Sequence, residues 1–267
     1  MKLSVIIPWR NRPEIETTLS ANSRIFAAHE LEVIVVNCAG NAEQLSTALS
    51  HINIPNLRSL ELHPAKFNKS LALNLGVYAA RAPYLFLLDT DVIFRDDSIP
   101  AALDMLETEA FVTIERAFES APHSSPEDSE IMEVVQSLRI VATGQREASV
   151  ETNRLRITDG SKSAPGLVFL ARRHFIEVGG MNSDLQGWGW EDIDLLLRLQ
   201  LGLGLTHRQI GSVTHLTHGD EVRYFGDLGH QSEQFNMAIC MENYKVGHFW
   251  GTYQDDVATW SAKLESH

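Results

Sequence analysis

The chain has 267 residues, 44% of them hydrophobic, and its 22 lysines and arginines against 35 aspartates and glutamates give a net charge of −13. This length fits one large α/β domain or a domain with a subdomain, and so acidic a chain is a poor candidate for binding nucleic acid or an anionic membrane surface. The two cysteines, Cys38 and Cys240, are too few for a disulfide framework or a cysteine zinc site.

Short apolar runs alternate with helix-like segments over the first ninety residues. We expect strands at 3–8, 31–37, 57–62 and 84–89, and helices at 14–28, 41–50 and 67–82. This order, with nearly continuous apolar strands, predicts a parallel sheet covered by helices on both faces. Ligands bind beyond the carboxyl ends of such strands, so 9–12, 37–40 and 89–91 are candidate binding segments.

The second half of the chain begins with a change of character. The stretch 117–163 is polar and acidic, which predicts an insertion or flexible excursion with a helix at 126–140. Regular structure is expected again in a strand and helix over 166–181, a helix over 191–204 opened by acids that suit its positive end, a strand over 205–218 and a mostly helical tail over 228–267.

Two carboxylates, Asp89 and Asp91, follow the apolar run 84–88. Side chains alternate along an extended chain, so residues two apart point the same way. Carboxylates at this spacing can meet one hard cation, Mg²⁺ or Mn²⁺, that bridges a diphosphate. The alternative is a solvated turn at the end of a strand.

The segment "GWGWEDIDLLLRL", residues 187–199, places two tryptophans before three acids at the start of a helix. The ring of Trp188 or Trp190 could stack on a sugar or a base. Asp192 or Glu191 could act as a general base on an incoming hydroxyl. The alternative is an acid-capped amphipathic helix whose tryptophans belong to the core.

Two histidines, His215 and His218, lie at the end of the last predicted strand. A neutral imidazole there could complete the coordination of a cation at Asp91. Residues three apart cannot both face the same way on a regular strand, so we expect one of the two to be a ligand.

Arginines recur two residues apart in "PWRNRPE", residues 8–14. Arg10 and Arg12 could fork onto phosphate oxygens or onto the edge of a base. The alternative is that they pair on the surface with Glu14 or Glu16.

Together these motifs resemble the GT-A glycosyltransferases, and within them the β-1,4-galactosyltransferases and related two-domain sugar polymerases. That family carries "IIPFRNR", "FNR" with a following "LLNVGF", an acid-x-acid motif, "WGWGGEDDD" and then a metal-binding histidine. This chain has IIPWRNR at 6–12, FNKSLALNLGV at 67–77, DTD at 89–91, GWGWEDID at 187–194 and THLTH at 214–218. The order and rough spacing agree over residues 3–225.

The resemblance implies a GT-A (nucleotide-diphospho-sugar transferase) fold, in which a mainly parallel central sheet is flanked by helices and accompanied by a small second sheet. It implies a catalytic domain over 1–225 and a helical extension over 226–267. It further implies an inverting transferase that uses Mn²⁺ or Mg²⁺ to move galactose or an N-acetylhexosamine from a UDP-sugar to a hydroxyl of a glycan, a lipid-linked sugar or a peptide.

The resemblance also assigns roles to single residues. Those matching donor contacts are Pro8, Arg10, Arg12, Phe67, Asn68, Lys69, Asp89 and Trp188, with Lys69 in place of the family arginine. Asp91 matches the metal-binding acid, and either His218 or His215 matches the metal-binding histidine. Glu191 matches an acid that holds the acceptor, and Asp192 matches the catalytic base. Trp190 stands where the family has a glycine, which points to an altered acceptor pocket.

Two other functions stay open on the sequence. A sugar nucleotidyltransferase would usually open its sheet with a glycine-rich phosphate loop and a lysine, and "PWRNRPE" contains neither. A binding protein for nucleotide-sugars or glycans would have no need of the acids and histidines. The start of the chain lacks the pattern of a signal peptide and no run of about 18 apolar residues occurs, so we expect a cytoplasmic protein in a reducing compartment.

Overall fold

The computed structural model describes residues 1–121, 129–219 and 230–267. Its strands are β1 Leu3–Trp9, β2 Glu32–Cys38, β3 Leu57–Leu62, β4 Tyr84–Leu87, β5 Val92–Phe94, β6 Ala110–Glu119, β7 Glu133–Val141, β8 Glu147–Arg156, β9 Lys162–Ala171, β10 Thr206–His215 and β11 Glu265–Ser266. Its helices are α1 Glu14–Ala28, α2 Ala42–Leu49, α3 Lys69–Ala79, α4 Ile99–Leu106, α5 Arg172–Glu177, α6 Glu191–Leu203, α8 His230–Lys245 and α9 Tyr253–Trp260, with 3₁₀ turns η1 Thr143–Gln145 and η2 Ser261–Lys263.

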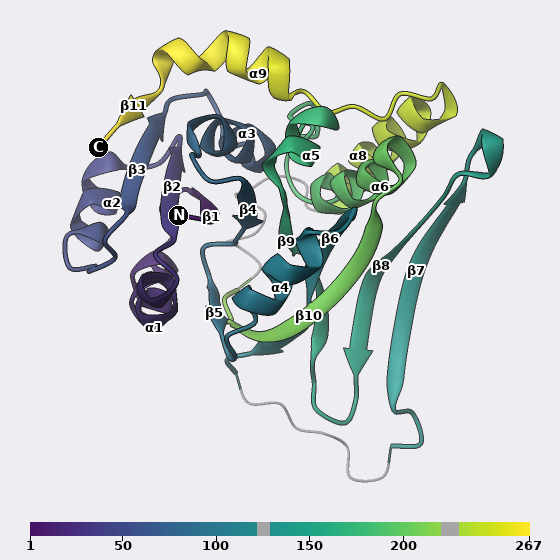
Figure 1. Ribbon diagram of the computed structural model, residues 1–267, viewed down its shortest axis with the longest axis horizontal. Helices are drawn as coiled ribbons and strands as arrows, with labels where there is room; N and C mark the ends of the chain where they lie inside the picture. The colour runs from purple at the N-terminus through teal and green to yellow at the C-terminus, as the bar shows by residue number, and fades with distance from the viewer. Residues whose placement is uncertain (122–128, 220–229) are drawn as a thin grey trace.

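The described strands form one sheet in the order β11-β3-β2-β1-β4-β9-β6-β10-β5, with the hairpin β7–β8 attached through β9 (Figure 1). Strands β3, β2, β1 and β4 are parallel to one another, as the alternation of strands and helices predicts. Strand β9 runs antiparallel between β4 and β6, and β10 is parallel to β6. The carboxyl ends of β1–β4, β6 and β10 therefore share one edge of the sheet, where β9 begins.

The hairpin β7–β8 corrects two expectations. A helix at 126–140 is wrong from residue 133 onward, where the chain forms β7, and residues 126–128 lie outside the described part. The expected small second sheet is not separate either, because β8 joins β9 through the pair Leu155–Lys162. The long cross-strand pairing of β7 with β8 favours extended chain where local propensity alone suggests a helix.

Two apolar layers cover the two faces of the sheet. One contains residues of α1, α2 and α4 against β1, β2 and β4, and the other contains residues of α3, α5, α6 and α9. Gly76 of α3 lies so close to β1 that a Cβ there would sit 2.3 Å from Ile6 Cγ2. The close approach of α3 fixes the position of its N-terminus, which points toward the site described below. Cys38 and Cys240 are both buried and unpaired.

The chain beyond residue 230 packs back onto the fold. Helices α8 and α9 confirm a mostly helical tail, and β11 adds an antiparallel edge strand to β3. Asn74 Nδ2 of α3 donates to Asp256 Oδ2 of α9 at 2.7 Å. The predicted boundary at 225 falls outside the described residues. None of the helices in the described part combines the length and hydropathy that crossing a membrane requires.

Candidate active site

A cavity of about 960 Å³ opens at the carboxyl edge of the sheet. Its walls come from segments that the topology brings to that edge: the ends of β1, β4, β6 and β10, the start of β9, the N-termini of α3 and α6, and the hairpin β7–β8. Of the predicted site residues, those that line it are Pro8, Arg10, Arg12, Phe67, Lys69, Asp89, Asp91, Trp188, Glu191, Asp192, His215 and His218.

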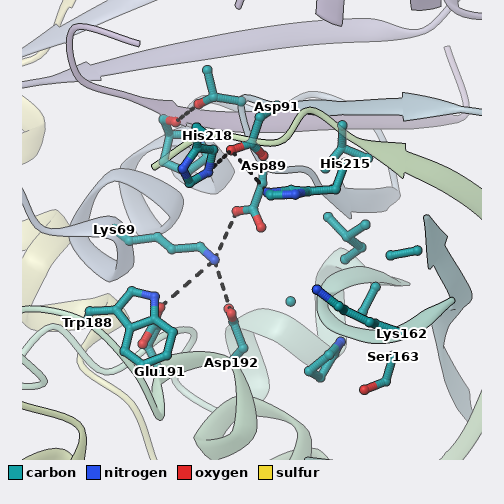
Figure 2. Close-up of a pocket in the computed structure, with 18 of the residues that line it drawn as sticks. Lys69, Asp89, Asp91, Lys162, Ser163, Trp188, Glu191, Asp192, His215 and His218 are labelled. Carbon is teal, nitrogen blue, oxygen red and sulfur yellow. Dashed lines mark hydrogen bonds and ion pairs between the residues drawn. The ribbon is translucent and has the colours of Figure 1, made fainter. Parts of the chain in front are cut away.

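One carboxylate and two imidazoles converge at one end of this cavity (Figure 2). Nε2 of His218 lies 3.2 Å from Asp91 Oδ2, and Nε2 of His215 lies 3.6 Å from the same oxygen. The three residues can offer ligand atoms that all lie within 4.8 Å of one another. Both histidines thus reach Asp91, which residues three apart on a regular strand could not do, because β10 ends at His215 and His218 lies beyond the strand.

The other ring nitrogen of each histidine already has a partner. Nδ1 of His215 lies 2.9 Å from Glu119 Oε2, and Nδ1 of His218 lies 3.1 Å from the carbonyl oxygen of Gly219. With a cation bound and the proton on Nδ1, each Nε2 could offer its lone pair to the metal, as in sites whose histidines are oriented by outer hydrogen bonds. Burial alone would lower the pKa of His215, but Asp91 and Glu119 raise it to about 9.

The Asp91 carboxylate also contacts the segment that follows β1. Nη2 of Arg12 donates to Asp91 Oδ2 at 2.7 Å while its Nε donates to Glu14 Oε2 at 3.0 Å, so the predicted pairing with Glu14 is present together with a contact inside the site. Burial opposes the charge of Asp91, yet its histidine neighbours and Arg12 hold its pKa well below the usual range. Thr90 Oγ1 donates to the Pro8 carbonyl oxygen at 2.7 Å, which ties the turn of the two aspartates to β1.

Lys69, at the first turn of α3, lies among three acids from two other segments (Figure 2). Its Nζ is 3.0 Å from Asp89 Oδ1, 3.1 Å from Asp192 Oδ2 and 4.0 Å from Glu191 Oε1. Burial opposes the ammonium charge, but the attraction of Asp192, Asp89 and Glu191 outweighs it and raises the pKa of Lys69. Asp89 therefore faces Lys69, and only Asp91 belongs to the group that could hold a cation.

Glu191 and Asp192 open helix α6 and differ in their surroundings. Burial, and then the neighbouring charge of Asp192, raise the pKa of Glu191 to about 7. Asp192 has its ion pair with Lys69, and its Oδ2 would lie 2.5 Å from a Cβ added at Gly166 of β9. The two adjacent acids thus differ in their surroundings: Glu191 is buried with a raised pKa, and Asp192 is paired with Lys69.

The predicted aromatic and amide residues of the site differ in whether they line the cavity. Trp188 and Phe67 line the cavity, whereas the half-buried Trp190 packs against the core layer of α3 and α6 and is not among its lining residues. Trp190 has φ 73°, a left-handed conformation that favours glycine. Asn68 caps α3, since its Oδ1 accepts from Leu71 N and its Nδ2 donates to the carbonyl of Ser183, both at 2.8 Å.

Several residues of the site carry no signal in the sequence. Glu119 of β6 orients His215 and pairs with Lys162 of β9 at 2.9 Å. Glu119 and Lys162 lie far apart along the chain. Helix α8 holds the tryptophan loop, because Ser232 Oγ donates to the Trp188 carbonyl at 2.9 Å and Asn236 Nδ2 to the Gly189 carbonyl at 2.8 Å. Only the folded topology reveals these partners.

The geometry combines a ligand set for a divalent cation, basic groups near it, and a carboxylate pair across the cavity. Such a site can hold a diphosphate at one side and receive a hydroxyl at the other.

Residues 4–248 match the model of the family described as glycosyltransferase-like family 2. The hyaluronan synthase of Pasteurella multocida is 26% identical over an alignment of 219 residues, and the match covers 74% of this chain and 22% of the synthase. A crystal structure of GalNAc-T7 with UDP, GalNAc and Mn²⁺ superposes with a TM-score of 0.59 at 15% identity, covering 91% of this chain and 48% of that one. For S. aureus TarS the TM-score is 0.52 at 16% identity, covering 81% and 60%. This chain thus spans part of its relatives, and the superpositions establish the GT-A fold.

Proposed function

Since this chain belongs to the glycosyltransferase-like family 2 and is a glycosyltransferase of the GT-A fold, we propose that it transfers a sugar from a UDP-sugar to an acceptor hydroxyl, with a divalent cation and with inversion at the anomeric carbon. One observation carries the proposal: the Asp91, His215 and His218 ligand set and the Lys69–Asp192 pair line a single cavity at the carboxyl edge of the sheet.

The donor atoms fit a divalent cation. Asp91 offers a carboxylate oxygen, and His215 and His218 offer Nε2 atoms whose partner nitrogens are held by Glu119 and by a backbone carbonyl. Two imidazoles favour Mn²⁺ over Mg²⁺, which prefers oxygen ligands and retained waters. When bound, the cation would neutralise charge on the departing UDP.

The chain's own residues divide the remaining work. Arg10 and Arg12 line the cavity, Arg12 in contact with Asp91, and their guanidinium groups can bind phosphate oxygens. The ring of Trp188, also in the lining, offers a flat apolar surface on which a sugar ring can stack. Phe67 adds a second aromatic ring to the lining.

Of the two acids of α6 that line the cavity, Asp192 is the one proposed as the base. Lys69 Nζ lies 3.1 Å from its Oδ2 and holds the carboxylate in the cavity, where it can accept the hydroxyl proton as the acceptor oxygen attacks the anomeric carbon. Glu191, with a pKa raised to about 7, keeps a proton for much of the time at neutral pH and can hold a second acceptor hydroxyl by donating a hydrogen bond. Displacement from the face opposite UDP inverts the anomeric configuration.

The similar proteins narrow the choice of donor sugar. They include a hyaluronan synthase and GalNAc-T7, whose crystal structure holds UDP, GalNAc and Mn²⁺, which supports a UDP-sugar of the galactose or N-acetylhexosamine type. The acceptor is proposed to be a hydroxyl on a glycan, a lipid-linked sugar or a peptide.

The test is release of UDP from a panel of UDP-sugars with Mn²⁺, with and without acceptor oligosaccharides. The proposal expects UDP release that requires one donor and rises with one acceptor class. Asp192→Asn should abolish this release, whereas Asp104→Asn, a control at an exposed aspartate, should leave it unchanged. Pyrophosphate formation from UTP and a sugar phosphate would favour a nucleotidyltransferase. Binding of UDP-sugar with no release under any acceptor would favour a binding protein.

A further inference from the structure

The outer strand of the hairpin, β7, has one edge without a partner among the described strands. It pairs only with β8, and Figure 1 shows the hairpin extending to one side of the sheet. Natural edge strands are usually kept from pairing with another chain by short length, proline, bulges or charged side chains. β7 has nine residues and no proline, and the bulge in the hairpin is on β8, where Thr152 is skipped between the pairs Gln136–Asn153 and Ser137–Glu151.

This strand and the residues before it are also apolar and exposed. Of the twelve large hydrophobic side chains exposed in the described part of the chain, five lie within residues 131–141: Ile131, Met132, Val134, Val135 and Val141. They are 47% to 63% exposed. A straight edge with this much exposed apolar surface is a template for another strand.

The sequence of the segment 131–141, IMEVVQSLRIV, fits its own antiparallel copy. With Gln136 opposite Gln136 of the copy, Glu133 stands opposite Arg139 at both ends. The apolar pairs are then Ile131 with Val141, Met132 with Ile140 and Val134 with Leu138. A shift of two positions would instead place Arg139 opposite Ile131 or Val135, so this register alone satisfies both charge and apolar matching.

Ion pairs within each hairpin would add to the charge pairing between the two copies. Arg139 Nη2 donates to Glu147 Oε2 of β8 at 2.7 Å, and Arg156 Nε of β8 donates to Glu133 Oε1 at 2.8 Å. Across the joined sheets the charges would alternate in the order Glu147, Arg139, Glu133 of the copy and Arg156 of the copy. The segment itself carries no net charge in a chain of net charge −13, so it is a place where two copies can approach.

We propose that β7 pairs antiparallel with β7 of a second copy of this chain, about a two-fold axis at Gln136, to form a dimer with one continuous sheet. This goes beyond the proposed activity: Gln136 at the axis also lines the cavity, but Glu133 and Arg139, which set the register, do not. A two-fold axis gives an isologous interface, in which each pair occurs twice.

The experiment measures oligomeric state by sedimentation of the native chain, Glu133→Arg, Arg139→Glu and their 1:1 mixture. The native chain should dimerise. Each single variant sets like charges opposite each other at both ends and should weaken its own dimer by about tenfold to a hundredfold. The mixture should dimerise again, because the chain with arginine at both positions then faces the chain with glutamate at both.

The mixture also separates pairing from folding. Damage to the hairpin would persist in both chains of the mixture, so recovery there cannot come from repaired ion pairs within one chain. Val134→Lys should block dimers, and Val246→Lys, a change at an exposed valine outside β7 and β8, should leave them intact. A native chain that stays monomeric at every concentration overturns the proposal, as does a native dimer that the charge reversals leave unchanged.

Discussion

Replacing Lys69 by methionine tests how the site holds three acids together. The change removes an ammonium that lies 3.0 Å from Asp89, 3.1 Å from Asp192 and 4.0 Å from Glu191, while it keeps an unbranched side chain of similar length. Removing one partner of a buried ion pair costs about 3–5 kcal/mol. Asp89 is 38% exposed, so water screens its share, and we expect a loss of about 3 kcal/mol in the free energy of unfolding at pH 8.

The loss should depend on pH through Glu191. Its pKa is raised from 4.5 to about 7 in the folded chain, so its contribution to stability is full below about pH 4.5 and is lost as the pH rises through 7. At pH 5 Glu191 is protonated in the folded chain, so the loss of Lys69 leaves two charged acids without their cation instead of three. The destabilisation by Lys69→Met should then be smaller by about 1–2 kcal/mol, since one pKa unit corresponds to about 1.4 kcal/mol.

Urea unfolding of the native chain and of Lys69→Met at pH 5 and pH 8 measures both effects. Lys69→Arg keeps the charge and should stay close to the native stability. Lys66→Met, at an exposed lysine that also lines the cavity, is the matched control and should be nearly neutral. Equal destabilisation by Lys69→Met at the two pH values, or none at either, would refute the reasoning.

Three further substitutions address single roles. Asp192→Asn should lower transfer by about 10²–10⁴-fold with UDP binding nearly intact; a variant that transfers at the native rate would move the role of base to Glu191. Gly166→Ala places a Cβ 2.5 Å from Asp192 Oδ2 and should reduce turnover with little change in melting temperature, whereas unchanged turnover would show that the carboxylate shifts without cost. Trp190→Gly should cost up to about 3–5 kcal/mol for lost packing, offset by about 1 kcal/mol because φ 73° suits glycine; an altered ranking in an acceptor panel on a stable variant would instead support the predicted acceptor role.

The first ninety residues could be predicted well because their signals are local. β1, β2 and β4 are short apolar runs, and helices such as α1 begin and end close to their predicted bounds. The rule that ligands bind at the carboxyl edge then places Arg12 and Asp91 together, and their contact at 2.7 Å confirms it.

The remaining features depend on distant partners. Local composition predicts a helix over 126–140, and only pairing with β8 makes residues 133–141 a strand. Lys69 is at a position that the family resemblance marks, but its neighbours Asp89 and Asp192 come from segments about 20 and 120 residues away, so its contacts follow only from the assembled sheet. Both histidines reach Asp91 because the strand stops at His215, a boundary that alternation along the sequence cannot predict.

The affinity for UDP, measured by titration calorimetry with Mn²⁺ and with EDTA for the native chain and Asp91→Asn, tests the central claim most directly. The native chain should bind UDP at least about tenfold more tightly with Mn²⁺, a difference of about 1.4 kcal/mol, because Asp91, His215 and His218 hold the cation against the diphosphate. Asp91→Asn should abolish that difference, while the control Asp104→Asn should preserve it. Equal UDP affinity of the native chain in Mn²⁺ and in EDTA would contradict a metal-dependent donor site.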